Sequence, residues 1–147
     1  MSTPMTDQAS AGSDSALVVE QAFAALQAGD FDKLGALLAD DVVYVNVGLP
    51  ASHGRAATMK VMKATRRIRL EVKVYRTVTE GAAVLNERTD VIGIGPLRLQ
   101  FWVCGVFEVH DGRITLWRDY FDFYDFARNG VRGVAGMVFP TLRPAMP

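Results

Sequence analysis

A change in hydrophobic period near Leu70 is the feature of this sequence that most constrains its fold. From that residue onward apolar and polar side chains alternate, as in "LEVKVYRTVT", which is the pattern of a half-exposed strand. Further strands are predicted over residues 82–94, 97–109 and 113–123. Because Asp111-Gly112 is a strong hairpin signal and the other connections are short, these strands should pair in sequence as an antiparallel sheet.

The first half of the chain has apolar residues at helical spacing instead. A first helix is predicted to begin at Ser13 or Ser15, since serine is a favoured N-cap residue. A short second helix over residues 31–40, a strand over 41–47 and a third helix over 52–67 are predicted to follow. On the third helix, Ala57, Val61 and Ala64 are expected to face inward, with the basic residues in solvent.

These elements together predict an α+β fold. We expect one curved, mixed and mostly antiparallel sheet of about six strands, with three to four helices packed on one side to form a cone-shaped pocket. Residues 1–13 are expected to be a disordered tail. Residues 14–147 should form a single domain, with a C-terminal tail from about residue 127.

Charge and composition narrow the classes of function. The chain carries 16 basic and 16 acidic residues, so it has no electrostatic footprint for nucleic acid or for an anionic membrane. No segment approaches the ~18 apolar residues that a membrane span needs. A single cysteine, Cys104, excludes an internal disulfide and fits a reducing compartment. The first dozen residues are polar and do not resemble a signal peptide, so we expect a cytoplasmic protein.

Three of the predicted strands place polar side chains among large apolar neighbours. In an extended chain alternate residues share a face, so Asn86, Arg88 and Asp90 leave their strand on one side. Apolar residues bracket these three on that side, as they would if the face looked into a cavity. The predicted strands over 41–47 and 113–123 show the same pattern, and Asp119 shares its face with the apolar neighbours Trp117 and Phe121. The candidate site residues from all three strands are Tyr44, Asn46, Arg88, Asp90 and Asp119.

A structural role competes with a functional one for each of these residues. A lone Arg–Asp pair on a strand is usually a half-exposed salt bridge that stabilises little. Burying charges costs several kcal/mol each unless they are paired, so polar groups from three strands in one apolar cavity favour function over stability. If Arg88 lies between Asp90 and Asp119, the cluster is neutral only when one carboxyl is ionised and the other protonated. Such a pair supplies an acid and a base, although these residues alone do not say which is which.

The segments "VLNERTD", "GVFEVHDGRITLWRDYFD" and the upstream "YVN" resemble those of the limonene epoxide hydrolases. That family belongs to the fold superfamily of nuclear transport factor two, which also includes ketosteroid isomerases and polyketide cyclases. The resemblance extends from about Leu17 to Phe123. It implies one-step addition of water to a lipophilic epoxide, giving a vicinal diol without a covalent intermediate.

The resemblance also implies a role for each candidate residue. Asp119 would be the general base, taking a proton from a water molecule that Tyr44 and Asn46 also hold. Asp90 would be the general acid, protonating the oxirane oxygen as the ring opens. Arg88 would lie between the two aspartates and orient both.

No cofactor and no metal are expected. His53 and His110 are too few and too scattered to bind a metal, and we expect His53 in a loop or cap and His110 in a solvent-exposed hairpin turn. The apolar strand "LQFWVCGVF" has a hydrophobic face beyond what one pocket needs. Because the resembled family usually pairs through its sheets, we expect a homodimer. Cys104 and its aromatic neighbours are interpreted as core or dimer-interface residues; these aromatics are Phe101, Trp102 and Phe107.

Two other functions remain open on the sequence. A relative of the same fold could use the aspartates as an isomerase or cyclase, and a non-catalytic carrier could use them to bind a hydroxyl group. The substrate is open as well: a terpene, a fatty-acid or a steroid epoxide would each fit the pattern.

Overall fold

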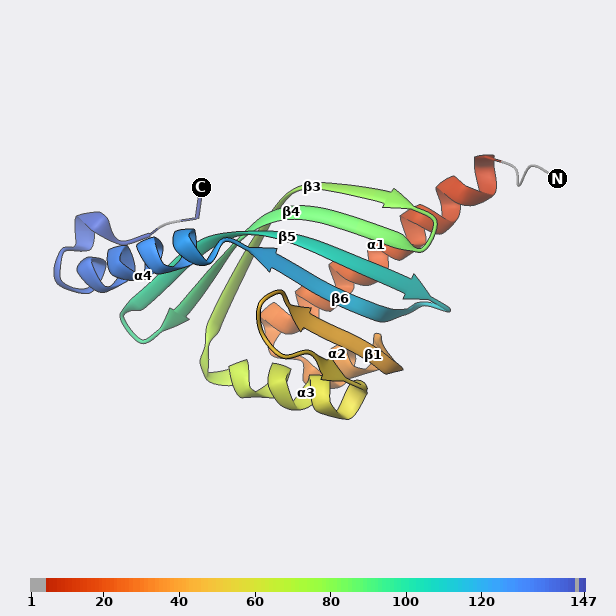
Figure 1. The fold of residues 1–147 in the computed structure, drawn as a ribbon, viewed down its shortest axis with the longest axis horizontal. Helices are drawn as coiled ribbons and strands as arrows, with labels where there is room; N and C mark the ends of the chain where they lie inside the picture. Colours follow the sequence, from red (N-terminus) through yellow and green to blue (C-terminus); the bar gives the residue numbers. More distant parts are fainter. Residues whose placement is uncertain (1–4, 145) are drawn as a thin grey trace.

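The computed structural model describes residues 5–144 and 146–147 (Figure 1). The elements in chain order are α1 (Met5–Ala28), α2 (Phe31–Ala36), β1 (Leu38–Asn46), β2 (Ser52–His53), α3 (Arg55–Ala64), η1 (Thr65–Arg67), β3 (Arg69–Glu80), β4 (Ala83–Ile94), β5 (Leu97–His110), β6 (Arg113–Phe121), α4 (Phe123–Val138) and η2 (Pro140–Leu142). The strands form one sheet in the order β2-β1-β6-β5-β4-β3. Neighbouring strands are antiparallel except for β1 and β6, which run parallel. The predicted α+β fold with a mixed, mostly antiparallel sheet is confirmed.

The sheet is strongly curved, and α1, α2 and α3 lie on its concave side (Figure 1). Shifts of register interrupt three of its strand pairs, between β1 and β6, β3 and β4, and β5 and β6. Such bulges increase the local twist and bend of a sheet. In the apolar core between helices and sheet, Phe23 of α1 packs edge-on against Phe107 and Trp117. The other end is left as a pocket.

Helix α1 begins earlier than the sequence predicts. It starts at Met5, so residues 5–13 are helical instead of belonging to a disordered tail; residues 1–4 of that expected tail lie outside the described residues. Contacts with the end of the sheet hold these first turns, since the buried Gly12 packs against Thr79 and the Ser15 hydroxyl donates to the Gly81 carbonyl.

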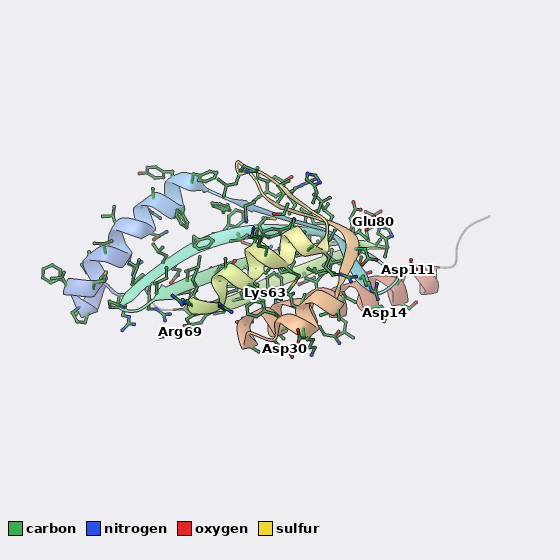
Figure 2. The ribbon with its side chains drawn as sticks, turned by 90° about the horizontal axis from the view of Figure 1, so that it is seen from below. Asp14, Asp30, Lys63, Arg69, Glu80 and Asp111 are labelled. Carbon is green, nitrogen blue, oxygen red and sulfur yellow. The ribbon has the colours of Figure 1, made fainter. Side chains whose placement is uncertain are left out.

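The serines that suggested an N-cap have other partners inside the helix. The Ser13 hydroxyl donates to the Ser10 carbonyl at 2.7 Å, a bond within α1. Figure 2 shows Asp14 of α1 at the same end of the molecule as Glu80 and Asp111 of the two hairpins. Contacts with the sheet at Gly12 and Ser15 therefore hold the N-terminal half of this helix.

The inward face of α3 also differs from the prediction. Thr58 and Met62 are buried there, whereas Ala57, Val61 and Ala64 are exposed. Burying a methionine removes more apolar surface from water than burying an alanine, so the helix turns its methionine side to the core.

The C-terminal segment forms a long helix and then crosses to the other side of the sheet. Asp122 ends the last strand and caps α4, its carboxylate accepting from the backbone N–H of Tyr124 at 2.8 Å. Residues 127–138, expected as the start of a tail, belong to this helix. Beyond it, Arg98 donates through Nε to the Pro144 carbonyl at 2.8 Å, and Lys73 donates to the carbonyl of Pro147.

Candidate active site

One cavity of about 250 Å³ lies between the helices and the concave face of the sheet. All of the sequence-predicted site residues line it, namely Tyr44, Asn46, Arg88, Asp90 and Asp119. Most of the remaining wall is apolar, and it consists of Phe23, Leu26, Leu49, Met62, Thr65, Ile68, Leu70, Ile92, Phe101, Val103, Trp117, Phe121 and Phe126. The alternation of side chains along the predicted strands therefore placed these polar residues on the face that lines the cavity.

The register of the sheet brings the polar residues together. Asn46 on β1 is the direct neighbour of Asp119 on β6, and the parallel pairing of these two strands makes both side chains face the cavity. Arg88 and Asp90 lie two residues apart on β4, on the same side of the sheet. Strand β5, which lies between β4 and β6, separates the two groups.

Arg88 joins these two groups across β5. Its Nε lies 2.9 Å from Asp90 Oδ1 and its Nη2 lies 3.2 Å from Asp90 Oδ2, so this carboxyl is bound in a bidentate manner. The same Nη2 lies 2.9 Å from Asp119 Oδ1 and forms an ion pair with this buried oxygen. The Arg88 side chain is only 1% exposed, and its guanidinium stacks over the ring of Phe23 at 4.8 Å.

Burial dominates the electrostatics of this cluster. It raises the pKa of both Asp90 and Asp119, while the charge of Arg88 opposes the rise at each. The ionised Asp119 raises the pKa of Asp90 further, and a hydrogen bond from Trp117 lowers the pKa of Asp119. Burial disfavours the charge of Arg88 as well, but the two carboxylates hold its pKa above the ordinary value. Burial therefore raises the pKa of both carboxyls, while the charge of Asp119 acts on Asp90 and the Trp117 hydrogen bond acts on Asp119 in opposite directions.

Tyr44 and Asn46 form a second polar pair beside Asp119. The side-chain amide of Asn46 donates to the Tyr44 hydroxyl oxygen at 2.8 Å. Burial first, and the neighbouring charge of Asp119 second, raise the pKa of Tyr44 to about 12, so this phenol stays neutral at any ordinary pH. The Tyr44 O–H proton and the amide oxygen of Asn46 remain available for a further molecule.

Several residues of the cluster were missed as site residues from the sequence. Trp117 was read only as an apolar neighbour, but its indole N–H donates to Asp119 Oδ2 at 3.1 Å. Asn86 was placed on the correct face without a role, and its Oδ1 accepts from Arg88 Nη1 at 3.1 Å. The N–H group that every tryptophan carries was the available signal for the first, and the shared face with Arg88 was the signal for the second.

The other sequence candidates lie away from the cluster. Phe101 lines the cavity and packs on Phe126 at 5.2 Å between ring centroids, so it belongs to the pocket wall. Cys104 and Trp102 fall on the opposite face of β5. His53 lies in β2 instead of a loop or cap.

Two general features complete the description. In the part of the chain that the structure describes, no group of three or more His, Cys, Asp or Glu side chains could hold a metal ion. Among these same residues, no helix combines the length and the apolar character that a membrane span requires.

An arginine-bridged pair of buried aspartates at the end of an apolar pocket is typical of one class of protein, the small-molecule enzymes. Comparison with known proteins narrows the class further. The chain belongs to the limonene-1,2-epoxide hydrolase family, whose catalytic-domain description matches residues 13–132.

Individual relatives agree with this assignment. The chain is 52% identical over 129 residues to "Epoxide hydrolase EphG" of Mycobacterium tuberculosis (strain ATCC 25618 / H37Rv), and the match covers 87% of each chain. It is also similar to a solved structure described as an M. tuberculosis LEH-like epoxide hydrolase. That structure has a TM-score of 0.89 and 49% identity, and the match covers 92% of this chain and 97% of the other.

More distant structures share the fold alone. A ketosteroid isomerase from Mycobacterium sp. has a TM-score of 0.68 at 20% identity, covering 76% of this chain and 95% of its own. A polyketide cyclase from Xanthomonas campestris, described as putative, has the same TM-score at 23% identity, covering 81% of this chain and 98% of its own.

Proposed function

We propose that this chain hydrolyses a lipophilic epoxide to a vicinal diol in one step, with Asp119 as general base and Asp90 as general acid. Epoxide hydrolysis follows from the family to which the chain belongs. The observation that carries the mechanism is the Arg88 bridge, which holds two buried carboxyl groups in one cavity. The charge of Asp119, which raises the pKa of Asp90, and the hydrogen bond from Trp117, which lowers the pKa of Asp119, support Asp90 as the acid and Asp119 as the base.

The base side of the site fits a single water molecule. Such a water can donate one proton to the Asp119 carboxylate and the other to the amide oxygen of Asn46, while it accepts from the Tyr44 hydroxyl. One lone pair then remains to attack a ring carbon. Holding the water in line with the breaking bond lowers the barrier through orientation, and the base contributes typically ~10²–10⁴ in rate.

The acid side fits the oxirane oxygen. An alkoxide is a poor leaving group, and a protonated Asp90 can transfer its proton to that oxygen as the ring C–O bond breaks. Arg88 remains on the carboxylate that results, so its charge stabilises the product state. After ring opening Asp119 holds a proton and Asp90 has lost one, and proton exchange through solvent restores the starting state. Side chains of this chain make both proton transfers, so the proposed step is complete without a cofactor or metal.

The apolar wall explains why the substrate should be lipophilic. Epoxides of the expected kind present mainly C–H surface, and each buried CH₂ contributes about 0.8 kcal/mol of binding free energy. The wall also limits access of bulk water to the opened ring. A panel of terpene, fatty-acid and steroid epoxides, scored for diol formation, identifies the preferred size.

Hydrolysis in isotopically labelled water tests the reaction type. We expect one solvent oxygen in each diol formed; consumption of an epoxide without solvent oxygen in the product would point to an isomerase or cyclase.

Asp119→Asn and Asp90→Asn should each abolish turnover while the fold and ligand binding persist. Asp111→Asn is the matched control, because Asp111 lies in the exposed turn between β5 and β6 and should keep full activity. A carrier would bind the epoxide and show no turnover before any mutation.

We further propose that the protein works as a homodimer that pairs through the convex face of the sheet. Three large side chains of that face are exposed in the single chain: Leu85 (39%), Trp102 (44%) and Tyr120 (41%). Exposed apolar patches often mark surfaces that another protein copy covers. Leu85→Glu and Tyr120→Glu should yield monomers in sedimentation experiments. Val138→Glu, on the exposed side of α4, is the control, and dissociation by that variant alone would refute this interface.

A cytoplasmic location and independence of cofactors are also proposed. The single cysteine, half-buried Cys104, fits a reducing compartment. Cell fractionation tests the location. Prolonged dialysis against a chelator should leave the rate of diol formation unchanged.

A further inference from the structure

The Arg88 side chain on β4 contacts the carboxylate of Asp119 on β6, which lies two strands away in the sheet. In the sheet register Arg88 on β4 pairs with Val103 on β5, whereas Asp119 on β6 pairs with Gly105. Gly105 pairs in turn with Asn86, so Asn86, Gly105 and Asp119 form one row across three strands. The guanidinium can meet Asp119 only by leaning out of its own row and across β5 at position 105.

The absence of a side chain at Gly105 makes this crossing possible. A Cβ atom there would lie 2.5 Å from Arg88 Nη1 and 2.7 Å from both Asn86 Oδ1 and Phe107 Cε2, all far inside contact distance. Gly105 lies within strand β5 and is not among the glycines with a positive φ. The position therefore requires space for the guanidinium and makes no demand for an unusual backbone conformation.

Asn86 occupies the one part of the guanidinium that the carboxyl groups leave free. Arg88 uses Nε and Nη2 for Asp90 and Nη2 for Asp119, and its Nη1 donates to Asn86 Oδ1. Asn86 is itself 4% exposed, so its amide is held among buried groups. Without this acceptor, Nη1 would be a buried donor with no partner, and the guanidinium would rotate to find one.

We propose that Asn86 and Gly105 form a seat for the Arg88 guanidinium and are positioning residues for the reaction. Neither touches the reacting atoms. Gly105 leaves the space through which the guanidinium crosses β5, and Asn86 fixes its rotation so that the other nitrogens face both carboxyl groups. This inference rests on the proposed hydrolysis, because it assigns what holds that acid and base in register.

Two substitutions in the seat test it, with one matched control. Gly105→Ala should displace the guanidinium, and Asn86→Leu should remove the acceptor at nearly constant volume. Each should lower kcat by about 10²-fold, the effect of misplacing a catalytic group by ~1 Å, with a much smaller change in KM. Gly93→Ala is the control, because a Cβ there would lie 3.4 Å from the Cβ of Arg69, an ordinary contact, and should leave kcat unchanged.

A readout beyond stability separates positioning from packing. The charged and titratable groups facing Asp119 are Arg88 and Asp90 of β4 and Tyr44 of β1. Because Arg88 lowers the pKa of Asp119, loss of its contact should move the acid limb of the kcat/KM profile to higher pH. A fall in thermal stability with an unchanged kcat and an unmoved acid limb would overturn the proposal.

A second variant at position 86 keeps the test decisive if Gly105→Ala does not fold. Asn86→Asp retains an acceptor oxygen for Nη1, so it should keep more of the parent kcat than Asn86→Leu. A role in packing alone predicts the reverse order, since leucine suits a buried site better than a carboxyl group.

A turnover-free measurement separates failure of the seat from failure of the proposed function. In the parent protein, ¹⁵N NMR should resolve the Arg88 Nη groups as slowly rotating, and Asn86→Leu should average them. Averaged signals in the parent would refute the seat whatever the activity. Absence of diol formation by the parent, with the Nη signals resolved, would refute the hydrolysis and leave the seat in place.

Discussion

Replacement of Arg88 by lysine removes the bridge and keeps the charge. A lysine ammonium is a compact group that lacks the planar fork of arginine, so it cannot bind Asp90 in a bidentate manner while it also meets Asp119 and Asn86. At least two of the contacts made by Arg88, at 2.9–3.2 Å, are then lost. Hydrogen bonds to charged groups contribute roughly 1.5–3 kcal/mol each, so we expect a loss of about 3–6 kcal/mol of unfolding free energy.

A matched control lies on the neighbouring strand. Arg76 forms an ion pair of 2.8 Å with Glu87, but its side chain is 76% exposed. Exposed pairs are worth about 0–1 kcal/mol, so Arg76→Lys should leave the unfolding free energy nearly unchanged. Both variants make the same chemical change, and only burial and the number of partners differ.

Urea unfolding of the parent and both variants measures the difference, and diol formation measures the effect on catalysis. Arg88→Lys should also lower kcat/KM by at least ~10²-fold, because no single side chain then holds the two carboxyl groups in position relative to each other. If Arg88→Lys and Arg76→Lys differ by less than about 1 kcal/mol in unfolding free energy at equal m-values, the arginine does not hold the cluster together and the reasoning fails.

Other predictions follow from the same cluster. The folded-state pKa values of Asp90 and Asp119 are both raised, so the native protein holds protons that the unfolded chain releases, and stability falls as pH rises from the ordinary carboxyl pKa through the raised ones. Asp90→Asn should reduce this fall, because it removes one of the two groups, as urea unfolding across that pH range will show. Trp117→Phe keeps the ring but removes the N–H donor to Asp119, so the acid limb of kcat/KM should move to higher pH; an unmoved limb would contradict the role of the indole. Tyr44→Phe should lower kcat at all pH values without adding a limb near neutrality, because the pKa of Tyr44 is raised to about 12.

The elements and faces of this fold could be predicted because they depend on local period. Alternation along β4 is enough to place Arg88 and Asp90 on one face, since strand geometry fixes that relation without any tertiary information. The same rule placed Tyr44 and Asn46 together on β1. Local pattern also identified the short turns and hence the antiparallel order of β3 to β6.

What the sequence could not supply depends on long-range contact or on atoms outside the apolar–polar classification. The N-terminal half of α1 is held by contacts of Gly12 and Ser15 with the β3–β4 hairpin, which no capping signal records. The donor role of Trp117 was hidden because tryptophan counts as apolar in a face argument. The need for space at Gly105 becomes visible only when Arg88 is seen to cross β5.

The parallel pairing of β1 with β6 has a consequence for the order in which the site forms during folding. Arg88 and Asp90 are near neighbours in the chain, so a β3–β4–β5 meander can assemble that part through short-range contacts. Asp119 meets Asn46 only after a loop spanning half the polypeptide has closed, and closures of that length are slow. During synthesis, a chain whose last strand has not yet emerged therefore holds Arg88 with Asp90 alone. The polar cluster is complete only when β6 adds Asp119.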